Sequence, residues 1–449
     1  MFKKNVKKMD EMSDFGELKS KLLDFRRYVR DTLTDKLQTF LSCVVTYYEF
    51  PKVQLRETFG IDILNNPYRS LYIVDDNTII IVVRIYESKA CIGAFLGIRF
   101  SREKIIQDNH LYEEIAKQVS KSLTYGYQNG FRNSLQFFGD LLIKTIISRC
   151  VSRGCYSHQL MMFAIDYFDS LRTTSFEGNF FSTGMIISKS HYAFIKDKDS
   201  LRGGVAHKLE QPMALLTMGY DRRFWYLADG KHTYYLCGPN LLVSDLFFTD
   251  SNSEGFDYIS VLTLRETLRG DDVLFRIESA KELSIINSKG SEFIFKENGW
   301  KFRNYINIYN LINAHISISM KVFDFLLYYV LYCSKNGVSS IIWIPENCND
   351  MDILLNKNKP MNNNVTITDP VYSPLILRLL SSDGATVVSK EGEVLYFGGI
   401  VKLDMTQIEG VHGTGETATS LLAKNGIAIK VSQDGAIKLA VNENQTVIL

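Results

Sequence analysis

Length, composition and charge limit what this chain can be. Its 449 residues exceed the roughly 250 to 300 at which a single core stops growing, so we expect two or three domains. Hydrophobic residues make up 46% and charged residues 22%, which is typical of a folded globular protein and excludes a disordered or fibrous chain. The 51 basic and 50 acidic residues leave a net charge of +1. This balance favours neither nucleic acid nor an anionic membrane, and we expect neither as a partner.

Cysteines and apolar stretches indicate the compartment. The seven cysteines are scattered and form no CxxC pair, so we expect buried reduced thiols rather than a zinc site. No apolar stretch of signal-peptide length follows the charged N-terminus. The most apolar window, 322–333, is shorter than the ~20 residues of a membrane-spanning helix and predicts a buried helix. We therefore expect a cytoplasmic protein.

Residues 1–170 are predicted to form an α+β domain with a leading amphipathic helix. Between residues 13 and 50, apolar side chains recur mostly every three or four positions, which indicates a helix that packs on its own domain or pairs with another copy. From Leu71 the runs LYIVDD, TIIIVVRIY and CIGAFLGIRF predict an antiparallel sheet. The helical period of residues 102–150 follows, and strands followed by helices indicate an α+β fold.

Residues 171–310 are predicted to be rich in strands. FWYLADGKHTYYLC predicts a hairpin that turns at Asp229, and ELSIINSKGSEFIFKENGWKF predicts a second that turns at Gly290. His207 and His232 have no acidic or cysteine partner at ligand spacing. Structural or solvated roles are therefore favoured over catalysis for both.

Residues 311–449 predict a mixed sheet flanked by helices, so the fold class is α/β (α+β). A helix over 320–335 precedes the central strand SSIIWIP, and SPLILRLLSS is a short helix before the strand TVVS. A third helix over 416–424 leads to IAIKV, which alternates as a half-buried strand. A turn at Asp434 then opens the closing strand IKLAV.

This order of elements, from about Ala314 to Leu449, resembles the diadenylate cyclase domain of the DNA-integrity-scanning protein family. Two short motifs carry the resemblance, DGA at 383–385 and the strand-turn VSQDGAI at 431–437. The stretch EFIFKENGWKFRNY, just before the domain, resembles the sensor modules that precede such domains in other bacteria. The rest of residues 1–310 lies outside the resemblance.

The first motif implies a metal site. By the resemblance Asp383 is catalytic, because it holds the divalent metal, Mg²⁺ or Mn²⁺, that neutralises the ATP triphosphate. Gly384 and Ala385 would line the nucleotide pocket. A 3′-hydroxyl that attacks an α-phosphate needs its charge compensated and the reactants aligned. The alternative is an ordinary Asp-Gly turn at the start of a strand, which needs no function.

The family's second motif, Gly-Thr-Arg-His-Arg-Ala-Ala, is replaced here by GTGETAT at 413–419. The resemblance places five further residues at the nucleotide: Gly413, Thr414, Gly415, Thr417 and Ser432. Without the arginines, a glycine-rich loop at a helix N-terminus can still hold a phosphate through its N–H groups and dipole. Glu416 is either a first-turn acid that favours the helix dipole or a second metal ligand beside Asp383.

Two functions from different classes follow. The first is a nucleotidyltransferase that condenses two ATP molecules into cyclic di-AMP or a related cyclic dinucleotide across the interface of a homo-oligomer. The second is a catalytically inactive module that binds a nucleotide or cyclic dinucleotide as a sensor. Loss of one preorganised cationic contact costs roughly a factor of 10² or more, which favours the inactive module, whereas the retained DGA motif and glycine loop favour the enzyme. The cyclase is the function that the resemblance directly implies, and the inactive module is the alternative. A third hypothesis makes the C-terminal domain an oligomerising platform for an activity of the N-terminal part.

Overall fold

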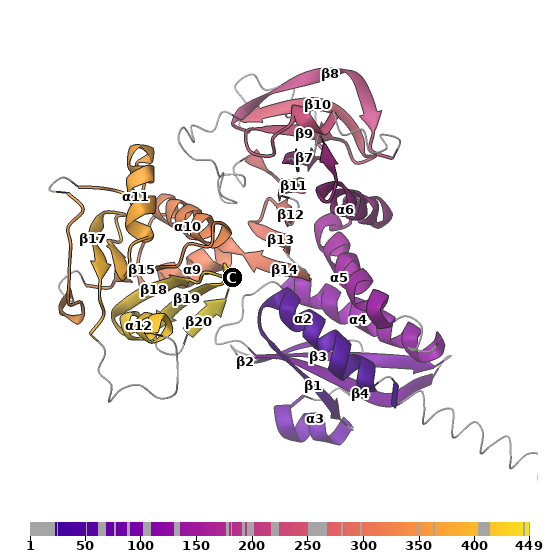
Figure 1. The fold of residues 1–449 in the computed structure, drawn as a ribbon. Helices are drawn as coiled ribbons and strands as arrows, with labels where there is room; N and C mark the ends of the chain where they lie inside the picture. The colour runs from indigo at the N-terminus through magenta and orange to yellow at the C-terminus, as the bar shows by residue number, and fades with distance from the viewer. Residues whose placement is uncertain are drawn as a thin grey trace, which may run out of the picture. The chain divides into compact units, whose positions relative to one another are not determined.

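The chain divides into two compact units. Figure 1 shows the ribbon of the computed structural model. The first comprises residues 1–167 with 295–302, and the second comprises residues 168–294 with 303–449. The three expected domains, with boundaries near 170 and 310, stay a prediction. The structure describes residues 23–24, 26–50, 52–61, 69–75, 78–87, 90–101, 109–129, 135–176, 179–180, 182–190, 194, 202–216, 224–249, 267–279, 282–296, 299–347, 351–361, 364–402, 414–442 and 445–448.

The first unit contains a four-stranded antiparallel sheet in the order β1-β4-β3-β2. Its strands are β1 (Val44–Phe50), β2 (Leu71–Asp75), β3 (Thr78–Glu87) and β4 (Ala90–Ser101). Its helices are η1 (Val29–Leu33), α2 (Thr34–Leu41), α3 (Lys52–Phe59), α4 (Asn109–Asn129), α5 (Leu135–Ser152) and the start of α6 (His158–Arg172). Because side chains alternate along a strand, Ile80 and Val82 pack with Phe59 at the end of α3, whereas Leu71 and Ile73 face α4.

The expected antiparallel sheet after Leu71 and the helices that follow it are confirmed. The expected leading helix is wrong in its last part, because the helix ends at Leu41 and residues 44–50 form β1. Ser42 has a left-handed φ of 50° and closes the helix, and the β-branched and aromatic run VVTYYEF then pairs with β4. The buried face of α2 packs within its own unit. Residues 1–22 lie outside the described part of the chain.

An eight-stranded, mostly antiparallel sheet lies in the second unit apart from residues 295–302 of β13 and β14, which belong to the first unit. Its order is β14-β13-β12-β11-β7-β9-β10-β8, in which β7 and β9 are parallel. Its strands are β7 (Thr183–Ile187), β8 (Gly204–Ala214), β9 (Thr233–Cys237), β10 (Leu242–Thr249), β11 (Val273–Ser279), β12 (Glu282–Asn287), β13 (Ser291–Lys296) and β14 (Gly299–Asn304); a separate pair is β5 (Ser175–Phe176) and β6 (Asn179–Phe180). The predicted hairpin at Gly290 is confirmed between β12 and β13, with a φ of 71° at that glycine.

The predicted hairpin at Asp229 is wrong in its first arm. Residues 224–227 form a 3₁₀ turn, η2 (Phe224–Leu227), because Trp225 is fully buried against the rings of Phe168 and Tyr235. Asp229 closes the segment instead, since its Oδ1 accepts the N–H groups of residues 231, 232 and 233, each at 2.8 Å. Only the second arm, β9, is a strand.

The C-terminal part of the second unit is a six-stranded mixed sheet in the order β17-β16-β15-β18-β19-β20, as expected. Its strands are β15 (Ser340–Pro345), β16 (Ala385–Val388), β17 (Val394–Gly399), β18 (Gly426–Val431), β19 (Ile437–Asn442) and β20 (Gln445–Ile448). Its helices are α9 (Tyr305–His315), α10 (Met320–Lys335), α11 (Ser373–Leu380) and α12 (Thr414–Leu422), with 3₁₀ turns η3 (Met351–Ile353), η4 (Pro370–Tyr372) and η6 (Ala423–Asn425). Strands β15 and β16 are parallel and the other neighbours are antiparallel.

Alternation along these strands builds two cores, one on each face of the sheet. Ile342, Ile429 and Leu439 share one core with helices α9, α10 and α11. Trp343, Ala428 and their neighbours share the other with α12. The α12 face therefore carries every second residue of β15, β16, β18 and β19. We call this alternation the parity of the strands. It decides which polar side chains of the sheet can lie near the start of α12.

The apolar window at 322–333 is buried within α10, as its length predicted. No helix in the described ranges is by itself long and apolar enough to cross a bilayer. Helices α9 and α10 reach that length and apolarity only as a pair, which is bent by 118° between them. Among the cysteines, Cys150, Cys237 and Cys333 are buried free thiols, and Cys43 and Cys155 are half-buried free thiols.

Candidate functional site

The two motifs of the C-terminal region meet at one end of its sheet. In the parallel pair β15 and β16, Ile341 lies opposite Ala385, and in the antiparallel pair β15 and β18, Ile341 lies opposite Lys430. The start of β16 and the close of β18 are therefore two strand spacings apart, about 10 Å. Asp383 and Gly384 lie just before β16, and Ser432 lies just after β18. We call this end of the sheet, together with the start of α12, the candidate site.

The start of α12 lies over the same row of residues. A Cβ atom placed on Gly415 would lie 3.4 Å from Lys430 Cε and 4.0 Å from Ile341 Cδ1. Thr414, the first residue of the helix, is exposed, and Thr417 is half-buried. The structure thus brings together every described residue that the resemblance assigned to the nucleotide. Gly413 lies outside the described residues.

The Asp-Gly-Ala motif has a structural role of its own. Gly384 has a left-handed φ of 92°, and a Cβ atom there would lie 2.8 Å from the carbonyl carbon of Gly398 and 2.9 Å from the carbonyl oxygen of Gly399. Only glycine permits this approach between the start of β16 and the end of β17. Asp383 is exposed, and its Oδ1 accepts the N–H of Gly384 at 3.0 Å. Ala385 is buried in the core under α12.

Glu416 already has a cation from its own chain. It lies in the first turn of α12, where a negative charge favours the helix dipole, and its Oε1 accepts a hydrogen bond from Lys438 Nζ at 2.8 Å. The side chains are 39% and 28% exposed, so the pair contributes little to stability, of the order of 0 to 1 kcal/mol. The first-turn reading accounts for this carboxylate, and its role as a second metal ligand stays a prediction.

Two lysines that the sequence reasoning missed supply positive charge at the candidate site. Lys430 of β18 and Lys438 of β19 lie directly opposite each other in the ladder, and parity places both on the α12 face. Like charges in this relation destabilise a sheet. Glu416 offsets the charge of Lys438, and a bound phosphate would offset the charge of Lys430. The alternation of IAIKV indicates that Lys430 lies on the same face of the sheet as Ala428. The pairing of Lys430 with Lys438 is not visible in the sequence.

The residues of the candidate site suit a metal ion that arrives with phosphates. Within the described ranges, no three or more His, Cys, Asp or Glu side chains form a group that could hold a metal ion. Mg²⁺, however, is usually held by one or two carboxylates together with water and substrate phosphates. The exposed carboxylate of Asp383 can provide one such ligand.

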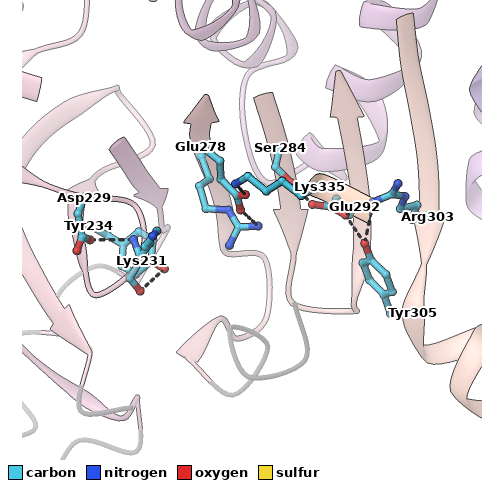
Figure 2. A network of polar contacts seen from close by, with 10 residues as sticks. Asp229, Lys231, Tyr234, Glu278, Ser284, Glu292, Arg303, Tyr305 and Lys335 are labelled. Atoms are coloured by element: carbon cyan, nitrogen blue, oxygen red, sulfur yellow. Dashed lines mark hydrogen bonds and ion pairs between the residues drawn. The ribbon is translucent and has the colours of Figure 1, made fainter. Parts of the chain in front are cut away.

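A second polar cluster lies on the other sheet of the same unit and is buried (Figure 2). Glu278 of β11 accepts from Arg276 Nη2 at 2.6 Å and from Lys335 Nζ, near the end of α10, at 2.7 Å. Arg276 is only 2% exposed. Burial alone would raise the pKa of Glu278, but the two cations outweigh burial and hold that pKa below its ordinary value.

The same cluster continues across the sheet to the start of α9. Glu292 of β13 is 1% exposed, and its two oxygens accept from the hydroxyls of Ser284 and Tyr305, the latter at 2.6 Å. Arg303 Nη1 of β14 lies 3.9 Å from Glu292 Oε2 (Figure 2). We call these six residues with Lys335 the buried network. Each of its two carboxylates and three cations lies beside a charge of opposite sign, which is typical of a structural rather than a catalytic cluster.

Comparisons with known proteins give little further guidance. The chain matches no protein-family model and no curated protein. Among solved structures, a hypothetical membrane spanning protein from Bacillus cereus matches with 18% identity over 32% of this chain and 69% of that chain, at a TM-score of 0.26. A double mutant of DacA from Staphylococcus aureus matches with 15% identity over 28% of this chain and 85% of that chain, at a TM-score of 0.22. These values are too low to support an argument about this chain.

Proposed function

We propose that the C-terminal part of the second unit is a nucleotide-binding domain of the diadenylate cyclase type. Its reaction would condense two ATP molecules into cyclic di-AMP or a related cyclic dinucleotide. The observation that supports this proposal is the convergence of Asp383, Ser432, Lys430 and the start of α12 at one end of one sheet. The cytoplasm, which supplies ATP and Mg²⁺, is the compartment we propose for it.

Each side of the candidate site would carry part of the chemistry. The N–H groups at the start of α12 and the ammonium of Lys430 would hold the phosphates that the missing arginines hold in the family. Asp383 would bind the Mg²⁺ or Mn²⁺ that neutralises the triphosphate. The 3′-hydroxyl of each ATP would attack the α-phosphate of the other, so that two phosphodiester bonds form, two pyrophosphates leave and the two hydroxyl protons pass to water. Because each domain presents one ATP, a homo-oligomer is required.

One observation favours the second candidate, an inactive module that binds a nucleotide or cyclic dinucleotide. The resemblance offers two carboxylates to a metal ion, Asp383 and Glu416, and Glu416 is already engaged by Lys438 at 2.8 Å. Lysines are point charges and do not form the two parallel hydrogen bonds with which arginine holds a phosphate. Binding can therefore survive a change that slows the reaction.

Incubation of the full chain with ATP and Mg²⁺ or Mn²⁺, followed by chromatography, tests both candidates. We expect a cyclic dinucleotide, and Asp383→Asn should reduce its rate of formation by roughly 10² or more, because charge compensation at the reacting phosphate is lost. Calorimetry with ATP and with cyclic di-AMP separates the alternatives. Binding without product would select the inactive module. Absence of both binding and product would overturn the nucleotide proposal.

A further inference from the structure

A small cavity of about 260 Å³ lies within the first unit, where η1 and α2 meet α5 and the start of β14. Nine described residues line it, all of them in the first unit: Asp31, Thr32, Asp35, Lys36, Thr39, Asp140, Ile143, Gly299 and Trp300. The volume is just below the range of drug-sized ligand sites, roughly 300 to 1,000 Å³, so the space suits a small molecule. Neither the nucleotide chemistry nor the motifs of the C-terminal region account for this cavity.

Two glycines hold the three walls of the cavity close together. A Cβ atom placed on Gly299 of β14 would lie 3.4 Å from Thr39 Cγ2 of α2. A Cβ atom placed on Gly139 of α5 would lie 3.2 Å from Lys36 Cγ of α2. The strand and the helix α5 therefore both approach α2 closely, and the lining side chains of α2 face the space between them.

The lining carries more negative than positive charge. Lys36 is the one cation among the nine residues, and its Nζ lies 2.8 Å from Asp140 Oδ1, so these two charges offset each other. Asp31 Oδ1 contacts Arg30 Nε at 2.9 Å, but Arg30 is 74% exposed and does not line the cavity. Asp35 is exposed and has no ion pair or hydrogen bond within the described chain. Asp31 and Asp35 are four residues apart on one helical face, where side chains are neighbours, so one cation can contact both.

Other cations of the surrounding elements do not offset these two carboxylates. On α5, Lys144 pairs with Asp166 at 2.8 Å. On β14, Lys301 follows Trp300, and alternation along the strand turns its side chain to the opposite face. Arg27, one turn before η1 closes, is exposed and does not line the cavity. The excess negative charge thus faces the cavity itself.

The floor of the cavity is apolar and contains an unused hydrogen-bond donor. Ile143 and Trp300 line it and are 3% and 4% exposed. The ring of Trp300 packs edge-to-face against Phe295, with ring centres 5.4 Å apart. The indole Nε1 is buried and has no hydrogen-bond partner in the part of the chain that the structure describes. A buried donor without an acceptor costs free energy, so an acceptor oxygen brought by a ligand would be stabilising.

We infer that this cavity binds a small organic cation that carries an acceptor oxygen, such as an amino-acid amide or an amino alcohol. Its ammonium group contacts Asp31 and Asp35, its methylene groups lie against Ile143, and its oxygen accepts from Trp300 Nε1. An organic cation suits the cavity better than a metal ion, since within the described ranges no three or more His, Cys, Asp or Glu side chains form a group that could hold one. The site is built from the first unit alone and does not depend on the proposed nucleotide function.

Ligand-observed NMR with the full chain tests this inference with three probes of similar length. 4-Aminobutanamide carries the cation and the oxygen, butylamine carries only the cation, and butanamide carries only the oxygen. We expect 4-aminobutanamide to bind most tightly, butylamine several-fold more weakly, and butanamide not measurably. Asp35→Asn should weaken both cations about tenfold, because a charge-assisted contact is lost. Trp300→Phe should reduce the affinity for 4-aminobutanamide to that for butylamine, because the ring stays but its donor is removed.

Glu57→Gln is the matched control, since Glu57 is an exposed carboxylate on α3 that does not line the cavity. It should leave binding unchanged. Circular dichroism checks that each variant is folded, and the exposed position of Asp35 keeps the test decisive if Trp300→Phe unfolds. The inference fails if neither cation binds the wild type, if butanamide binds as tightly as 4-aminobutanamide, or if Asp35→Asn and Glu57→Gln behave alike. Equal affinities of the wild type for 4-aminobutanamide and butylamine would overturn the role given to Trp300.

Discussion

The candidate site and the buried network are two polar clusters of one unit that differ in their exposure to water. In the buried network Arg276, Glu292 and Tyr305 are 2%, 1% and 0% exposed, and each charge contacts one of opposite sign. At the candidate site Asp383 is exposed and the Glu416 to Lys438 pair is half-exposed. A buried charge must be compensated within the protein, whereas a hydrated charge can exchange water for a ligand. The many polar contacts of the buried network thus indicate a structural role. The few contacts and the exposed charges of the candidate site indicate a place where a ligand can bind.

Removal of a charge from the buried network should give the largest effect. Glu278→Ala leaves the buried guanidinium of Arg276 without its 2.6 Å partner, so we expect a loss of about 3 to 5 kcal/mol in the free energy of unfolding of the second unit. Urea unfolding followed by tryptophan fluorescence measures it. A Trp300→Phe background restricts the signal to Trp225 and Trp343, which both belong to the second unit.

Lys335→Ala in the same background is the control for that measurement. The variant removes the other cation that contacts Glu278. The side chain of Lys335 is 39% exposed, so water can take the place of its ammonium group. We expect a loss of about 1 kcal/mol or less. Equal losses for the two variants would contradict the contrast between buried and exposed charge.

The glycines of the candidate site offer the next largest effect. Gly384→Ala forces a Cβ atom to within 2.8 Å of the Gly398 backbone at a φ of 92°, so we expect a loss of about 1 to 3 kcal/mol without any nucleotide. Gly415→Ala meets only ordinary contacts at 3.4 Å or more and should not destabilise the helix. Thermal unfolding of both variants measures the difference. If both lose the same stability, the role assigned to Gly384 in packing β16 against β17 is wrong.

A smaller effect is expected at Lys430. Lys430→Gln should weaken ATP binding about tenfold in calorimetry, because one charge-assisted contact to a phosphate is lost. It should raise the stability of the empty sheet slightly, since repulsion with Lys438 disappears. Lys424→Gln, in the turn η6 that follows α12, is the matched control and should bind ATP as the wild type does. A normal affinity in Lys430→Gln would remove this residue from the proposed phosphate site.

The smallest effect concerns acid stability. The pKa of Glu278 is lower in the folded chain than in the unfolded chain, so its contribution is present at neutral pH and is lost as pH falls through the folded pKa. Glu278→Gln lacks this contribution. The gap in unfolding free energy between wild type and variant should therefore narrow below about pH 4. A gap that stays constant from neutral pH to pH 3 or so would show that the carboxylate charge is not the cause.

Much of the C-terminal fold could be predicted from sequence, because its helices and strands carry clear periods and its turns carry glycine. The alternation of IAIKV and IKLAV predicted β18 and β19, and the apolar stripe of 320–335 predicted α10. The failures lie where tertiary contacts override local pattern. Residues 44–50 continue an apolar helical period, but they pair with β4 as a strand. Residues 224–227 have the composition of a strand, but they form a 3₁₀ turn whose Trp225 side chain is fully buried.

The candidate site was predictable only as a set of motif positions. Sequence placed Asp383 and Thr414 by resemblance, but their distance depends on the register between β15, β16 and β18. The same register brings Lys430 opposite Lys438, which no local pattern contains. The need for glycine at 384 likewise arises from a strand that follows it in the chain. The pairing of strands far apart in the sequence thus determines which residues meet at the candidate site, and the motifs alone do not.

The hairpin of β13 and β14 has a consequence for how the chain can be cut. Its tip, residues 295–302, belongs to the first unit, although nearly 130 residues of the second unit separate it from residue 167 along the chain. Phe302 lies 6.4 Å, centre to centre, from the ring of Phe40, which is fully buried. A fragment that stops at 170 would lose this cover and expose an aromatic surface to solvent, with aggregation as the expected outcome. Fusion of residues 290–304 behind such a fragment through a flexible linker should restore its solubility.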